Sequence, residues 1–124
     1  MKSPAIITAA ALMVSAAIAT VSDATAQPLS GIFTAKMIDG GDMYQRGSTT
    51  TFTMTPCGRD CTHLDTGKGT RSDLRLRGTA WSGPFGVSAS TGAPCTAVLD
   101  GFSLVLTEHC PGLRDVVIRL AKLD

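Results

Sequence analysis

The sequence predicts an all-β protein, a small antiparallel meander of seven or eight short strands that forms a barrel or half-barrel. Apolar and polar residues alternate in several short stretches, as in half-buried strands. Turn residues separate these stretches at intervals of about eight to twelve residues. No stretch after the leader carries apolar residues at helical spacing over three turns. A β-sandwich is the alternative, and the short connections favour the barrel.

The N-terminus indicates export. Lys2 precedes an apolar run over residues 5–21, and Ala24-Thr25-Ala26 fits the small-x-small pattern of a cleavage site. We expect a helical signal peptide at residues 1–26 and a single secreted β domain at residues 27–124. A run of about 17 apolar residues is marginal for a membrane span, and no cysteine at the cleavage point could accept a lipid. We therefore expect a secreted or cell-envelope protein without a stable membrane anchor after cleavage.

The strand candidates share alternation and flanking turn residues; they are residues 32–38, 49–55, 62–65, 72–78, 80–82, 95–99, 102–107 and 115–123. The first ends at the turn Asp39-Gly40-Gly41. The second places Phe52 and Met54 on one face and three threonines on the other. It stops at Pro56, which cannot donate to a ladder.

The later candidates are defined in the same way. Leu74 and Leu76 point inward from the fourth, between charged residues. Gly83-Pro84 is expected to bend the fifth, and residues 87–94 are expected to form a loop. The last candidate is apolar at nearly every position, so it is either central or closes the sheet against the first strand.

The cysteines predict two disulfides; they are Cys57, Cys61, Cys95 and Cys110. An even number in a small exported domain indicates structural bridges. Among the three pairings that four cysteines allow, Cys57–Cys61 with Cys95–Cys110 is favoured because both bridges are local. Loop entropy predicts a stabilisation of about 2 kcal/mol from the short bridge and about 3 kcal/mol from the longer one.

The longer bridge constrains the hairpin around Asp100-Gly101. Asp-Gly between two apolar runs predicts a hairpin. A two-residue turn at Asp100-Gly101 would place Cys95 opposite Leu106. A loop from Asp100 to Ser103 would place Cys95 opposite Glu108. Bridged Cα atoms lie within about 7 Å, so we expect the longer loop or a bulge. If neither forms, the alternative is that the disulfides join cysteines of the two halves of the chain.

Metal and redox sites are weaker alternatives for the same cysteines. A zinc site would combine Cys57, Cys61 and His63 with His109 or Cys110, but only one close cysteine pair is present. A redox motif has two residues between its cysteines, whereas this pair has three. The sequence predicts no metal and no cofactor.

No catalytic constellation is recognisable. The segment Gly86-Val87-Ser88-Ala89-Ser90 lacks the final glycine of a nucleophile elbow. His63 and Asp65 share one strand face, and we expect a solvated pair. Glu108 is the only glutamate, so a carboxylate pair would need an aspartate that nothing nearby supplies. The sequence therefore predicts no enzymatic activity.

The charge balance argues against nucleic acid as a partner. Lysine plus arginine number 11 and aspartate plus glutamate 10; removing Lys2 and Asp23 with the leader leaves 10 and 9, so the net charge stays +1. This balance is not typical of a protein that binds nucleic acid or an anionic membrane. Five basic residues could share one face: Arg59, Lys68, Arg71, Arg75 and Arg77. Aspartates lie between them in the sequence and reduce the positive potential of that face.

The aromatic residues bear on whether the barrel interior is filled. Phe33, Phe52, Trp81 and Phe102, together with Phe85, could line a cavity. A small barrel is just wide enough to be filled by side chains or to admit one small ligand. A packed core is the simpler expectation for a small domain, and a small apolar ligand is the alternative.

The order of motifs resembles a known group of proteins. Gly-x-Phe-Thr is followed by Thr-Phe-Thr-Met-Thr-Pro-Cys-Gly-x-x-Cys, then Leu-x-Gly-x-x-Trp, Cys-Thr-Ala-x-Leu-Asp and Cys-Pro-Gly-Leu. This pattern resembles small secreted mycobacterial proteins that are mostly described as uncharacterised. The resemblance spans nearly all of the region after the leader. It implies export, disulfides and an all-β fold, and it brings no catalytic or binding residues.

These features predict an exported, disulfide-stapled, single-domain β protein that acts as a non-catalytic binding or interaction module. Its partner would be an unidentified protein or envelope component. One alternative is a carrier of a small apolar ligand in the barrel mouth, and the other is an enzyme of unknown class.

Overall fold

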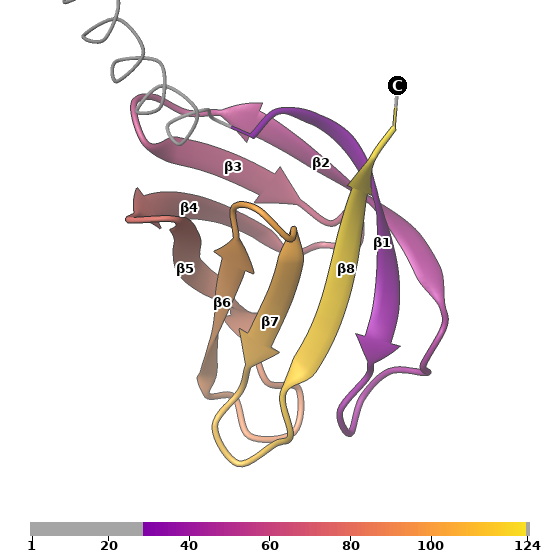
Figure 1. The fold of residues 1–124 in the computed structure, drawn as a ribbon. Coiled ribbons are helices and arrows are strands. Elements are labelled where there is room, and N and C mark those ends of the chain that lie inside the picture. The colour runs from indigo at the N-terminus through magenta and orange to yellow at the C-terminus, as the bar shows by residue number, and fades with distance from the viewer. Residues whose placement is uncertain (1–28, 124) are drawn as a thin grey trace, which may run out of the picture.

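Residues 29–123, as described by a computed structural model, form one antiparallel sheet that closes into a barrel (Figure 1). The strands are β1 (Gly31–Asp39), β2 (Thr49–Pro56), β3 (Cys61–Asp65), β4 (Arg71–Arg77), β5 (Ala80–Val87), β6 (Pro94–Asp100), β7 (Val105–His109) and β8 (Val116–Lys122). The predicted all-β meander is confirmed, and the closed barrel replaces the sandwich alternative. The predicted signal peptide and its cleavage site lie outside the described residues.

The barrel closes because each strand pairs with the next in the chain and β8 returns to β1. At this seam Ala35 lies opposite Leu120 and Met37 opposite Ile118. The final strand therefore closes the sheet against the first, which is one of the two positions its sequence allowed. Closure gives every strand a partner on both sides over at least part of its length, which limits the unpaired edges that are the usual template for aggregation of sheet proteins.

The core fills the barrel because alternate residues of every strand point inward. The buried apolar residues come from all the strands; they are Phe33, Ala35, Phe52, Met54, Leu64, Leu74, Trp81, Phe85, Ala97, Leu99, Leu106, Val116, Ile118 and Leu120. Thr62 is buried among them, and its hydroxyl donates to the carbonyl of Leu29 at 2.7 Å. The buried hydroxyl thus has its hydrogen bond, as a buried polar group requires.

The Gly83-Pro84 dipeptide lies inside β5 and interrupts the pairing of β5 with β4. Pairing of β5 with β4 ends at Ser82, opposite Arg75, while pairing with β6 continues to Pro84. Proline has no N–H to donate, which explains why the β4 side is lost first. A bulge then carries β5 on to Val87, so the strand reaches into the segment that was predicted as loop.

Both favoured disulfides, Cys57–Cys61 and Cys95–Cys110, are present. In the hairpin Leu99 lies opposite Leu106, so residues 101–104 form the connection. The expected longer loop is present, and its register lies two residues further along β7 than a loop from Asp100 to Ser103 would give. The Asp100 carboxylate accepts the backbone N–H groups of Phe102 and Ser103, which stabilises the wider loop. The Cα atoms of Cys95 and Cys110 lie 4.3 Å apart as a result.

Candidate functional site

The barrel mouth that contains the loops after β1, β3, β5 and β7 holds a pocket of about 210 Å³. Its walls are apolar where the strands supply them, through Ala35, Met37, Phe52, Phe85 and Ile118. Its rim carries hydroxyl groups, including those of Tyr44, Thr50, Thr66 and Thr70. Two charged residues also line it, Lys68 and Glu108. The pocket therefore combines an apolar interior with a small number of polar groups, as ligand sites do.

Glu108 is the unusual residue of this pocket. Leu106 and Glu108 alternate inward on β7, so the side chain of the sole glutamate points into the barrel and is 8% exposed. Burial raises the pKa of its carboxyl above the usual range, because the charged form loses hydration. Alternation along β7 is enough to point Glu108 inward with Leu106, whereas the hairpin register and barrel closure set which groups surround it.

No donor satisfies the Glu108 carboxyl among the described residues. The one contact of hydrogen-bond type that it makes within these residues is with Cys110 Sγ, 3.5 Å from Oε2. That sulfur is bonded to Cys95 and carries no proton, so it cannot donate. None of the ion pairs within residues 29–123 includes Glu108. A buried carboxyl without a donor is costly, and this one faces a pocket.

The loop between β1 and β2 brings Tyr44 to the rim above Glu108. Burial raises the pKa of Tyr44, and the nearby charge of Glu108 raises it further. The loop is fixed to the β7–β8 loop by Arg114, whose N–H and Nε donate to the Asp42 carboxylate and whose Nη2 donates to the Gly41 carbonyl at 2.6 Å. The backbone and side-chain hydrogen bonds from Arg114 to the carboxylate lower the pKa of Asp42. The loop that carries Tyr44 is thus held by hydrogen bonds to the β7–β8 loop.

The predicted lining residues divide into two groups. Phe33, Phe52 and Trp81 are buried inside the barrel, but only Phe52 borders the pocket; the other two fill the packed part of the core. The expectation for Phe102 is wrong, since it is 66% exposed. The wider hairpin loop displaces it from the inward-facing row of β7 to the surface. Phe85 borders the pocket.

The cysteine clusters do not offer thiolates in this oxidised state. Sulfur atoms of Cys57 and Cys61 lie close to Asp73, and those of Cys95 and Cys110 close to Glu108. Each pair is joined as a disulfide, whereas a metal ligand is a deprotonated thiol. The cysteines therefore act as covalent links in the wall.

The histidines make ion pairs on the outside of the barrel. His63 lies 2.6 Å from Asp73 on the neighbouring strand, and the expected pairing with Asp65 is wrong because Asp65 contacts Arg71. His109 contacts Asp115 at 2.8 Å. Neither histidine borders the pocket in the mouth.

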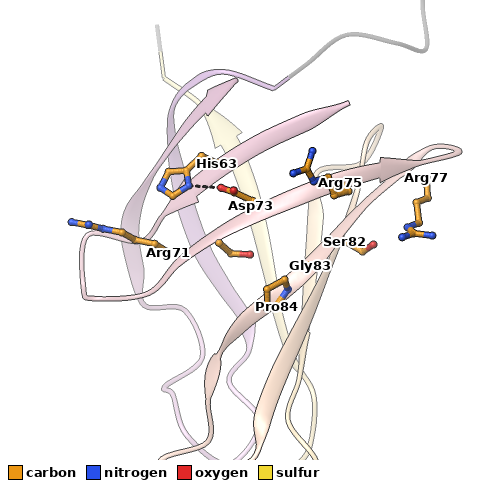
Figure 2. A pocket seen from close by; sticks show the side chains of 9 residues that line it. His63, Arg71, Asp73, Arg75, Arg77, Ser82, Gly83 and Pro84 are labelled. Carbon is orange, nitrogen blue, oxygen red and sulfur yellow. Dashed lines mark hydrogen bonds and ion pairs between the residues drawn. The ribbon is translucent and has the colours of Figure 1, made fainter. Parts of the chain in front are cut away.

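A second, open depression follows the split between β4 and β5, as Figure 2 shows. The outward row of β4 supplies Arg71, Arg75 and Arg77, and Asp73 stands between them bound to His63. Three of the five basic residues that could share a face thus do so. Carboxylates of the same wall neutralise part of this charge, and the depression is a shallow surface groove (Figure 2).

The groove depends on close approach of β5 to β4 at one point. A Cβ atom on Gly83 would lie 2.5 Å from the Asp73 carbonyl oxygen, so only glycine fits. Beneath it, the Ser72 hydroxyl is buried without a hydrogen-bond partner. Since Pro84 has no N–H, this part of the wall is short of donors.

Comparison of the chain with protein-family models, with curated proteins and with solved structures gives no match. Residues 29–123 include no helix with the length and apolar content needed to cross a bilayer.

Proposed function

We propose that this protein is an exported, non-catalytic binding protein that holds one small molecule in the mouth of its barrel. The main support is the Glu108 carboxyl, which borders a pocket of about 210 Å³. This residue is 8% exposed, and its carboxyl has no hydrogen-bond donor among the described residues. A ligand group that donates to this carboxyl would remove the cost of leaving it unpaired. Eight-stranded barrels have an interior of suitable width for one small ligand.

The chemistry of the pocket supports binding over catalysis. Glu108 is the one carboxylate that borders it within residues 29–123, and both histidines are engaged in ion pairs outside it. A nucleophile with an adjacent base, or a pair of carboxyl groups, is what most hydrolytic mechanisms need. The described part of the pocket lacks both arrangements.

Export is supported by two independent features. The disulfides Cys57–Cys61 and Cys95–Cys110 indicate an oxidising, extracytoplasmic environment. The leader pattern at residues 1–26 agrees with it. A secreted or envelope-located carrier would bind its ligand outside the cytoplasmic membrane.

Native mass spectrometry tests this proposal on protein exported by its own host and purified without denaturation. We expect a reproducible small-molecule adduct. Thr50→Phe, at the rim, and Ala35→Leu, in the wall, should each abolish the adduct by filling the pocket. Val98→Phe, on the exposed outer face, is the matched control and should retain it. An adduct that survives both filling variants would overturn the proposal, as would bare protein in every preparation.

A second function, recognition of a partner by the outer surface, is favoured by the arginine row of β4. Arg75 and Arg77 form no ion pair within the described residues, and both border the groove. Replacing both with glutamine tests this function in a pull-down from the host envelope. If the variant no longer captures an envelope component but still shows the small-molecule adduct, the two functions are separate.

A further inference from the structure

We propose that the ligand of the barrel mouth is a small primary amine, bound as an ammonium ion with its nitrogen against Glu108 and its apolar body against Phe52 and Phe85. This inference rests on the proposed function and names the class of ligand. The charge, the aromatic lining residues and the size of the pocket support it.

The charge of the pocket favours a cation at its inner end. Glu108 is buried, borders the pocket and has no protein donor among residues 29–123. An ammonium group brings three donors and a positive charge, and charge-assisted hydrogen bonds are about twice as strong as neutral ones. A carboxylate ligand would meet like charge there. A neutral alcohol would supply one donor without neutralising the charge.

Aromatic rings border the same space. Phe52 and Phe85 contribute from the strands, and Tyr44 from the rim. The faces of such rings attract cations, and the attraction grows when the site is partly shielded from water. Carboxylate and rings together form an environment that is suited to an ammonium group attached to a hydrocarbon.

The size and the rim limit the ligand further. The pocket volume of about 210 Å³ lies below the roughly 300 Å³ at which pockets for drug-sized ligands begin. Lys68 is exposed at the rim, where it would repel a second positive charge. The ligand is therefore a compact monoamine, and a diamine or polyamine fits less well.

Three probes with the same ring and different head groups test the class: benzylamine, benzyl alcohol and benzoate. Each is titrated into the full-length mature protein at neutral pH, and binding is followed by amide chemical shifts. We expect benzylamine to bind at least about tenfold more tightly than benzyl alcohol, and benzoate to bind most weakly. Glu108→Gln should remove the preference for the amine over the alcohol. Asp60→Asn, the same change at an exposed site of the opposite barrel end, should leave it intact.

The outcomes separate this inference from the proposed function. Equal binding of amine and alcohol in the mouth, or tighter binding of benzoate, would overturn the amine class and leave the ligand pocket standing. Binding of none of the probes would contradict both. If Glu108→Gln fails to fold, as judged by lost amide dispersion, the order of the three affinities in the unmodified protein still decides.

Discussion

Cys95 and Cys110 face one another across β6 and β7 with their Cα atoms 4.3 Å apart, and the Glu108 carboxyl lies 3.5 Å from the sulfur of Cys110. The disulfide thus closes the wall beside the group that we place at the centre of ligand binding. The disulfide fixes β7, which carries Glu108, against β6. The pocket keeps its shape at that position without a hydrogen bond to the carboxyl.

The two bridges should differ in their contribution to stability. Replacing both Cys95 and Cys110 with alanine should lower the free energy of unfolding by about 3 kcal/mol, because the bridge closes a loop with a sequence separation of 15. The same change at Cys57 and Cys61, with a separation of 4, should cost about 2 kcal/mol. Urea denaturation of the two double variants measures both values. A larger loss from the short bridge would contradict the loop-entropy argument.

The stability of the protein should depend on pH through Glu108. Burial raises its pKa above that of the unfolded chain, so the folded state binds more protons between the two values. This contribution to stability is complete below the unfolded pKa of about 4.3 and is lost as pH rises through the folded pKa. Tyr44 and Lys68 are the other titratable groups that border the pocket with Glu108.

Glu108→Gln removes this dependence. The stability of the variant relative to the unmodified protein should therefore be higher at about pH 7 than at about pH 4. Paired urea curves at both pH values give the difference, with Asp60→Asn as the surface control. If the variant is instead less stable, relative to the unmodified protein, at about pH 7 than at about pH 4, the charged form of Glu108 is stabilised in the folded state.

Gly83 should be intolerant of any side chain. Its Cβ would lie 2.5 Å from the Asp73 carbonyl oxygen, a backbone atom that cannot rotate away. Gly83→Ala should cost about 1–3 kcal/mol of unfolding free energy, as overpacking does. Ser82→Ala, one residue earlier on the partly exposed outer face, should change stability by less than about 0.5 kcal/mol. Equal stability of the two variants would refute the close approach of β5 to β4.

Two buried hydroxyls should respond in opposite ways. The Thr62 hydroxyl donates to Leu29 at 2.7 Å, so Thr62→Val should cost about 1 kcal/mol. The Ser72 hydroxyl has no partner, so Ser72→Ala should be neutral or stabilising by up to about 1 kcal/mol. Thermal unfolding of both variants under one condition compares them. A costly Ser72→Ala would mean that the hydroxyl has a hydrogen-bond partner in solution.

The strands were predictable because their information is local. Alternation around Phe52 and Met54, or Leu74 and Leu76, fixes a strand and its inward face without knowledge of its neighbours. Pro84 misled the assignment of β5, because a proline can stay in a strand where pairing on its N–H side has ended.

The hairpin register was not predictable from alternation. The two-residue turn, the loop to Ser103 and the observed loop differ by steps of two residues on β7, so all of them keep Leu106 inward. The bridge between Cys95 and Cys110 selects the observed register, since it places the cysteines opposite one another. The pocket depends on that choice and on closure between β1 and β8, which join the two ends of the chain. Alternation with Leu106 points Glu108 inward, but its place beside the pocket and its proximity to Tyr44 are not visible in the sequence.

The most direct measurement of the central claim is a crystal structure of the mature protein soaked separately with benzylamine and with benzyl alcohol. The account predicts electron density for the ring in the barrel mouth beside Phe52 and Phe85, with the amine nitrogen within hydrogen-bond distance of Glu108. An empty mouth with both probes, or density only in the outer groove along β4, would contradict it.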